Sequence, residues 1–174
     1  CYNSPKNYSD YDGKKAKSEI DITQRLNDAM ESHYQELQQY YKKHGLIMSV
    51  FYFINKVRTG GDWDLKNQGD WNLVKNQDYV YNGITIRSDE PGNIHFGYVG
   101  SVIFDAETLQ AGAGVYQILS DTSKPEFYSS YFDDPIDSMN VMYGYLLKNG
   151  SSYSFPGYTI TIEEFEKTYR ETHK

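Results

Sequence analysis

The sequence has few or none of the features that mark disulfide-rich, membrane-spanning or nucleic-acid-binding proteins. Its 174 residues hold one cysteine, so no disulfide can form within the chain. No segment reaches the roughly 20 apolar residues that cross a bilayer, and the best candidate, residues 46–57, is interrupted by Ser49 and Asn55. Basic residues are few, with 17 Lys and Arg against 24 Asp and Glu. The net charge of −7 gives no electrostatic footprint for non-specific binding to nucleic acid.

Aromatic residues, in contrast, are abundant. With 18 Tyr, 8 Phe and 2 Trp they make up 16% of the chain, although the mean hydropathy is only −0.72. Much of the core must therefore consist of amphipathic rings, which bury area while their hydroxyl groups find partners. The length is sufficient for a core that needs neither disulfides nor metals. We predict one domain over residues 18–174.

The one cysteine is the first residue, and a polar spacer follows it. Residues 2–17 contain Pro5 and Gly13 and show no hydrophobic period, which is typical of a flexible, disordered tether. A cysteine followed by such a tether is similar to the start of a mature bacterial lipoprotein. We therefore expect a lipid on Cys1 to be the protein's contact with a membrane, in the periplasm or at the cell surface. The alternatives are a secreted effector and a Cys1 that only marks a processing boundary.

Hydrophobic periodicity predicts a mainly α (α+β) fold, a compact domain of about five to six helices with a small β-hairpin. Apolar residues recur at helical spacing over residues 22–41, after a capping-box pattern that begins at Asp21. Residues 46–57 are apolar nearly all round, which predicts a central buried helix. Caps and spacing predict three further helices, over residues 107–119, over residues 134–149 and from residue 161 onward.

The predicted β-hairpin lies between the second and third of these helices. Two β-prone triplets, residues 79–81 and 84–86, flank Asn82-Gly83, which is the signal of a type I′ turn. Pro91-Gly92 then predicts a turn that closes this region.

Three polar, glycine-containing or acidic segments lie among the apolar stretches. They are residues 58–66 (RTGGDWDLK), 92–97 (GNIHFG) and 132–137 (FDDPID). In this combination and order they resemble the bacterial toxin 44 family of polymorphic toxins, over about residues 52–147. Phe132 stands where the family pattern has glycine, and Ile94 where it has an aromatic residue. Neither difference removes a polar group from the candidate site.

The resemblance implies a small hydrolytic toxin domain of interbacterial competition. Such domains attack the nucleic acid or the cell envelope of a competitor, and a cognate immunity protein is the expected partner. The resemblance does not indicate which chemical bond of the target is hydrolysed.

His95 is the first candidate for catalysis, because a group that titrates near neutral pH is the usual acid or base. The alternative is a structural hydrogen-bonding histidine. Asp64 and Lys66 are expected to point the same way from an extended loop, either as a surface ion pair or with Lys66 stabilising an oxyanion while Asp64 orients His95.

Three aspartates, Asp133, Asp134 and Asp137, crowd one helix N-terminus. One or two suffice for capping, and repulsion among the three would raise a carboxyl pKa enough for an acid. Arg58, Trp63 and Asn93 are candidate substrate-binding residues, with a buried anchor as the alternative for Trp63. One histidine with scattered carboxylates does not make a zinc site, so we expect neither metal nor cofactor.

Three functions remain open at this point. They are a hydrolase that acts on the envelope, on peptidoglycan or its precursors; a metal-independent RNase; and a non-catalytic surface lipoprotein with the toxin fold. Cys1 and the negative charge favour the first, since an RNase would present more Lys and Arg near its cleft. A nucleic acid is therefore the less favoured substrate.

Overall fold

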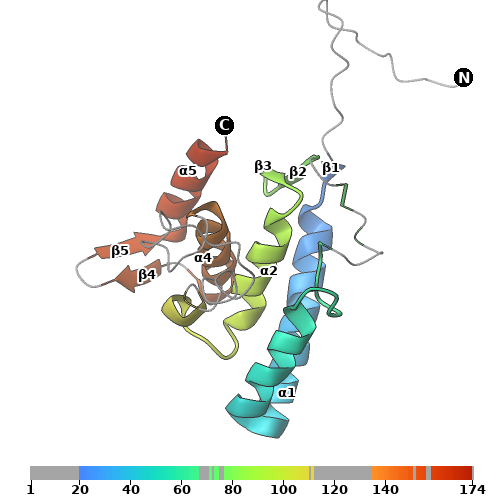
Figure 1. The fold of residues 1–174 in the computed structure, drawn as a ribbon. Coiled ribbons are helices and arrows are strands. Elements are labelled where there is room, and N and C mark those ends of the chain that lie inside the picture. Colours follow the sequence, from blue (N-terminus) through green and yellow to red (C-terminus); the bar gives the residue numbers. More distant parts are fainter. Residues whose placement is uncertain are drawn as a thin grey trace, which may run out of the picture.

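Figure 1 shows the computed structural model, which describes residues 20–66, 71, 73–74, 77–109, 111, 135–150, 152–155 and 158–173. Helices dominate and two small β elements accompany them, so the predicted mainly α class is confirmed. Cys1 with its tether and Asp133 and Asp134 lie outside the described residues. Of the helix expected over residues 107–119, only residues 107–109 and 111 are described, and they are helical. No described helix is long and apolar enough to cross a membrane.

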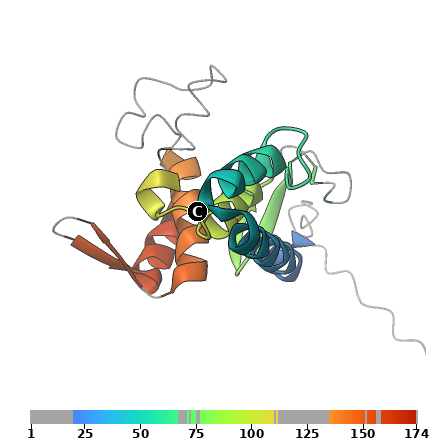
Figure 2. The ribbon, with the colours of Figure 1, turned by 90° about the horizontal axis from the view of Figure 1, so that it is seen from below.

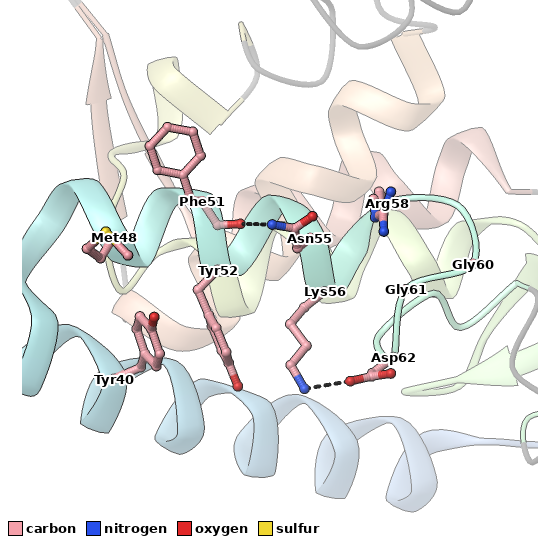
Figure 3. Close-up of a pocket in the computed structure, with 10 residues that line it drawn as sticks. All are labelled: Tyr40, Met48, Phe51, Tyr52, Asn55, Lys56, Arg58, Gly60, Gly61 and Asp62. Carbon is pink, nitrogen blue, oxygen red and sulfur yellow. Dashed lines mark hydrogen bonds and ion pairs between the residues drawn. The ribbon is translucent and has the colours of Figure 1, made fainter.

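Helix α1 spans Thr23–Val57 and reverses its direction at Gly45. Gly45 has φ 75° and ψ 178°, a conformation that L side chains rarely adopt. The first half (residues 23–44) and the second half (residues 46–57) therefore lie antiparallel and side by side (Figure 3). The side chains of Tyr40 and Tyr52 stack between them, with ring centroids 4.0 Å apart. The capping box predicted from Asp21 was wrong, because the N-cap is Ile22 and makes no side-chain cap hydrogen bond. Asp21 precedes the N-cap, and its Oδ1 accepts a hydrogen bond from the Thr23 backbone nitrogen.

The prediction that residues 46–57 form a central buried helix was wrong. Ser49 and Phe53 are buried, and the Ser49 hydroxyl donates to the Gly45 carbonyl at the reversal. Five apolar side chains of this half are instead 50% to 73% exposed: Leu46, Ile47, Met48, Phe51 and Ile54. An apolar composition all round does not say which side of a helix faces the core. Here the first half of α1 and helix α2 (Glu90–Gly100) cover only a narrow stripe of the second half.

The predicted hairpin is confirmed. Strands β2 (Asp78–Tyr81) and β3 (Ile84–Arg87) pair antiparallel, and Asn82 and Gly83 both have positive φ, as a type I′ turn requires. The sequence did not predict the short strand β1 (Ile20–Asp21), which pairs parallel to β2. This pairing fixes the start of α1 against the hairpin, since Ile22 then donates its backbone N–H to the Val80 carbonyl.

Helix α2 (Glu90–Gly100) packs against helix α4 (Pro135–Asn149) with almost no space between the two backbones. A Cβ on Gly97 would lie 1.9 Å from the Val141 carbonyl oxygen, and a Cβ on Gly144 would lie 1.9 Å from that of Ile94. The turn expected at Pro91-Gly92 is the first turn of α2, because proline fits the start of a helix. The glycines that weaken the helical pattern are what allow the contact.

Helix α5 (Ile162–Thr172) begins with the capping box predicted at residue 161 and completes the core. The Thr161 hydroxyl accepts from the Glu164 backbone N–H, and the Glu164 carboxylate accepts in return from the Thr161 backbone N–H. Phe165 and Tyr169 point inward. Before α5 lies a hairpin that was not predicted, β4 (Ser152–Phe155) paired with β5 (Tyr158–Thr161).

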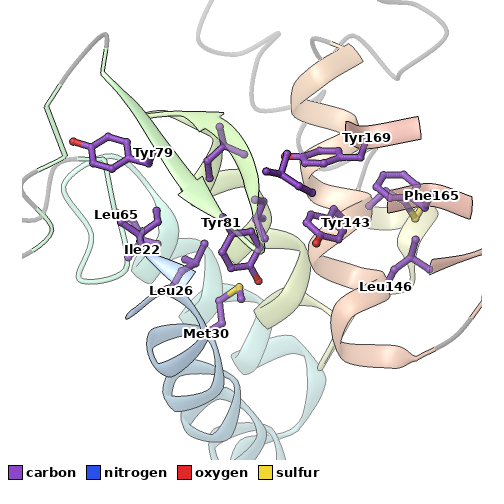
Figure 4. Packing of buried hydrophobic residues seen from close by; sticks show 14 of the residues in the cluster. Ile22, Leu26, Met30, Leu65, Tyr79, Tyr81, Tyr143, Leu146, Phe165 and Tyr169 are labelled. Atoms are coloured by element: carbon purple, nitrogen blue, oxygen red, sulfur yellow. The ribbon is translucent and has the colours of Figure 1, made fainter. Parts of the chain in front are cut away.

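The core between these elements is rich in tyrosine, as the composition predicts (Figure 4). Tyr81, Tyr143 and Tyr169 are fully buried. The Tyr81 hydroxyl donates to Asn27 at 2.9 Å, that of Tyr143 to Glu166 at 2.9 Å, and that of Tyr169 to Asn140. Each ring thus buries apolar area without leaving its hydroxyl unpaired.

The end of α5 contacts the turn between β2 and β3 and the start of α2. The Arg170 guanidinium donates to the carbonyls of Asn82 and Gly83, both at 3.0 Å. His173 Nε2 lies 3.0 Å from the carboxylate of Glu90, which is almost completely buried at the start of α2. These contacts fix the N-terminal end of α2, the helix that carries His95.

Candidate functional site

Two histidines meet where α2 crosses the first half of α1. His95 Nε2 lies 2.8 Å from His33 Nδ1, so the two imidazoles form a hydrogen bond in which one ring donates and the other accepts. His95 is 1% exposed, whereas His33 is partly exposed. His33 Nε2 is the ring nitrogen outside this bond, and it belongs to the more accessible ring. The pair is called the histidine dyad below.

Trp63 fixes the orientation of the dyad. Its indole stacks on the His33 imidazole with centroids 4.8 Å apart and planes 15° apart, and it meets His95 edge-on at 6.1 Å. Trp63 itself is buried. The face that lies against His33 is not open to a substrate, so Trp63 acts as a buried anchor for the catalytic candidate.

The surroundings keep both histidines neutral near pH 7. Burial, and then the neighbouring His33, lower the pKa of His95 to about 3. Burial also lowers the pKa of His33, Glu36 opposes this shift, and Lys56 adds to it. A neutral imidazole has a lone pair that accepts a proton. The partly exposed His33 is therefore the candidate base, and the buried His95 is its positioning residue.

Charged side chains surround the dyad on its outer side. Lys56 Nζ lies 2.7 Å from Asp62 Oδ2 and 3.4 Å from Glu36 Oε1. The Tyr52 hydroxyl donates to the same Glu36 carboxylate. The hydrogen bond with Asp62 raises the pKa of Lys56 above its usual range, so this ammonium group stays charged. The dyad therefore has a fixed cation and a carboxylate as electrostatic neighbours.

A cleft of about 370 Å³ opens beside this group (Figure 3). It lies between the two halves of α1 and is closed at one end by the loop that follows them. Lys56 connects the cleft to the dyad, because it borders the cleft and lies 5.5 Å from the Trp63 ring on which His33 stacks. The lining residues are Tyr40, Met48, Phe51, Tyr52, Asn55, Lys56, Arg58, Gly60, Gly61 and Asp62.

Asp64 and Lys66 do not point the same way. Asp64 is buried, and its carboxylate accepts from the backbone nitrogens of Gly60 at 2.9 Å and Lys66 at 3.2 Å, which braces the loop. The hydrogen bond to His95 comes from His33 instead. Lys66 is exposed, and its aliphatic chain packs over Gly92 at the start of α2.

Asn93 and Asp137 join the second and third of the polar segments. Asn93 Nδ2 donates to Asp137 Oδ1 at 2.6 Å, across the N-terminal ends of α2 and α4. Asn93 and His95 are two residues apart in α2, so they do not face each other. The predicted site residues thus fall into two groups, His95 with Trp63 around the dyad, and Lys66 with Asn93 and Asp137 at the helix ends.

The described residues contain no group of three His, Cys, Asp or Glu side chains that could hold a metal ion.

A comparison with protein families matches the model of Bacterial toxin 44 over residues 52–150, more than half of the chain. The chain belongs to the bacterial toxin 44 family. No curated protein and no solved structure matches it. The matched part of this toxin 44 domain includes His95 and both groups of predicted residues, whereas His33 lies before it.

The sequence did not predict His33, Glu36, Tyr52 or Lys56 as parts of the candidate site. The spacing could have predicted that His33 faces the core. It lies three residues after Met30 and four before Leu37, and both of these are fully buried on the inner face of α1. A titratable residue on an apolar stripe needs a partner. The partner, His95, is 62 residues away in the chain. Arg58 was predicted, and it borders the cleft as an exposed side chain.

The buried dyad predicts a loss of stability in mild acid. Since the folded pKa of His95 lies below the value of about 6.5 in unfolded chains, the unfolded state takes up a proton below pH 6.5 that the native state does not. The free energy of unfolding is expected to fall by about 2 kcal/mol between pH 6.5 and 5, at about 1.4 kcal/mol per pH unit. His33 acts in the same direction.

Urea unfolding at several pH values measures this slope. His95→Asn should flatten it, while the exposed His44 provides the control, since His44→Asn should leave it unchanged. His173 has a raised pKa because its bonds to Glu90 and to the Tyr169 carbonyl outweigh its burial, so its stabilisation is lost only as the pH rises above 6.5. A wild-type slope of zero from pH 6.5 to 5 would contradict a neutral buried dyad.

Proposed function

We propose that this toxin 44 domain is an acid–base hydrolase of the bacterial cell envelope, with His33 as the general base. The observation that supports this most is the dyad itself. A neutral, partly exposed imidazole is held by a buried one and by a stacked indole, and its charged neighbour Lys56 lines a cleft. A structural histidine needs no such access.

In the proposed reaction, His33 Nε2 takes a proton from the attacking water as the water adds to the scissile bond. The resulting imidazolium is stabilised by Glu36, whose charge raises the pKa of His33. The role of oxyanion stabiliser fits Lys56 better than Lys66, because Lys56 is the charged neighbour of His33. His33 then returns the proton to the leaving group. His95 keeps the ring in place and does not contact the substrate.

The lining of the cleft favours an envelope substrate, a sugar or a peptide, over a nucleic acid. Its walls combine aromatic rings, the Asn55 amide and charges of both signs, Lys56 and Arg58 with Asp62. Sugars and peptides use aromatic faces and scattered polar groups, whereas nucleic acid needs a continuous positive surface. The net charge of −7 disfavours nucleic acid further.

An RNase is the second candidate, and one observation favours it. A neutral imidazole base, His33, with the cations Lys56 and Arg58 at the nearby cleft suits transfer of a phosphodiester, which needs no carboxylate. Lys56 and Arg58 would then hold the phosphate. The third possibility, a non-catalytic surface lipoprotein, leaves the neutral dyad without a role.

Expression in two compartments separates these functions. An envelope hydrolase is expected to stop growth only when it is exported to the periplasm, because peptidoglycan and the exposed ends of its precursors lie outside the inner membrane. An RNase would be toxic in the cytoplasm instead. Growth curves with and without a signal peptide, together with assays of purified protein on peptidoglycan and RNA, give the answer. If the protein is harmless in both compartments and leaves both polymers intact, the hydrolase proposal is wrong.

A further inference from the structure

The second half of α1 exposes an apolar face to solvent in the part of the chain that the structure describes. Ile47, Phe51 and Ile54 follow one another at helical spacing and form a stripe, and Leu46 and Met48 extend it toward the reversal at Gly45. These five residues are called the α1 apolar face. Scattered apolar residues at a surface are common, but a contiguous set on one helix indicates a binding surface.

The charge around this face is the opposite of the charge of the whole chain. Residues 37–61 contain none of the 24 acidic residues. Of their four basic residues, Lys56 is paired with Glu36 and Asp62, which leaves Lys42, Lys43 and Arg58 as the basic residues near the face. Lys42 and Lys43 are exposed beside the reversal, and Arg58 is exposed at the other end of the helix. An acidic protein thus carries an apolar stripe that has positive charge at both ends.

The position of the face in the fold leaves it accessible. The reversal of α1 lies at the end of the molecule away from the β1–β3 sheet and from the end of α5 (Figure 1). The view along that direction shows the same end nearest to the viewer (Figure 2). The two antiparallel halves make this tip a rigid hairpin whose apolar face can approach a flat surface.

We propose that the α1 apolar face docks onto an anionic lipid membrane. Its apolar side chains would enter the boundary between headgroups and acyl chains, as those of interfacial amphipathic helices do. Lys42, Lys43 and Arg58 would remain at the level of the phosphate groups, where basic residues are attracted to anionic lipids. The α1 apolar face would bind the membrane surface without crossing it, and it needs no lipid on Cys1. Met48, Phe51 and Arg58 also line the cleft of the proposed function, so docking would bring that cleft to the membrane.

Two other occupants fit less well. A symmetric dimer through this face would bring Lys42, Lys43 and Arg58 of both copies together, and like charges across an interface are unfavourable. A nucleic acid would pair with the basic residues but would leave the apolar stripe in water. A lipid surface satisfies both parts of the face.

Vesicle flotation with the full, unacylated chain tests the proposal. We expect the protein to float with vesicles of phosphatidylglycerol and phosphatidylcholine, and to bind pure phosphatidylcholine at least about tenfold more weakly. The double variant Ile47→Ser/Phe51→Ser should lose binding, and Lys42→Glu/Lys43→Glu should lower it by at least about tenfold. Both change exposed residues, so far-ultraviolet circular dichroism and the thermal transition should stay as in the wild type.

Two matched variants serve as controls. Val74→Ser removes an apolar residue of similar exposure outside the face, and Lys167→Glu reverses an exposed charge on α5; both should bind as the wild type does. The proposal is overturned if the wild type does not float with anionic vesicles, or if the variants of the face bind as well as the controls. Dimerisation in sedimentation velocity that Ile47→Ser/Phe51→Ser abolishes would assign the face to a second copy instead.

Discussion

Replacing His33 with asparagine is expected to lower the hydrolytic rate by about 10²–10⁴, the usual cost of removing a general base. Asparagine can still hydrogen-bond from near the position of Nδ1, so His95 keeps a partner, but the amide accepts no proton at neutral pH. The change therefore removes the base and preserves the packing. Growth inhibition by the exported protein should disappear with it, and the release of soluble envelope fragments by purified protein measures the rate.

The matched control for this variant is His44→Asn. His44 is exposed on the same helix and lies outside the dyad, so its loss should leave the rate unchanged. His95→Asn should be intermediate, because His33 then loses the ring that holds it in place. A His33→Asn protein with the wild-type rate would remove His33 from the mechanism.

Replacing Gly97 with alanine is expected to destabilise the fold by about 3 kcal/mol or more, at the upper end of what overpacking costs. The new methyl group would meet the Val141 carbonyl at 1.9 Å, so two helix backbones would have to separate. For a chain of this size that corresponds to a fall of about 6–12 °C in the thermal transition. Circular dichroism during heating measures it. The Asn93–Asp137 hydrogen bond across the same helix pair should be lost too.

Gly92 provides the control in the same helix. Alanine there would meet the end of the flexible Lys66 side chain at 3.3 Å, and that side chain can move. Because alanine favours a helix over glycine by up to about 1 kcal/mol, Gly92→Ala should be neutral or stabilising. Equal losses from the two substitutions would show that helix propensity, and not the contact with α4, sets the effect.

The sequence predicts the elements that local chemistry decides. The Asn82-Gly83 turn, the cap at Thr161 and the helix that starts at Pro135 each depend on residues within a few positions of one another, and all three are confirmed. The exposed second half of α1 was mispredicted, because burial depends on which distant segment covers a helix. Pro91 was read as a turn because a proline suits both a turn and a helix start.

The candidate site was only partly predictable for the same reason. His95 and Trp63 lie in segments that resemble the family, so the sequence singles them out. His33 lies in an ordinary helical pattern outside the family match, and its role depends on a contact over 62 residues. Asp64 shows the converse, since a carboxylate in a polar segment serves the loop backbone.

The hydrogen bonds that Arg170 donates to the Asn82-Gly83 turn affect the order in which contacts form during folding. The turn closes over two residues, and such hairpins form in about 1–10 μs. The Arg170 guanidinium can reach the carbonyls of Gly83 and Asn82 only after a loop of 87 or 88 residues has closed. The entropic cost of closing this loop delays the contact. A bond made after the folding barrier slows unfolding and leaves folding at its former speed. We therefore expect Arg170 to lengthen the lifetime of the native state.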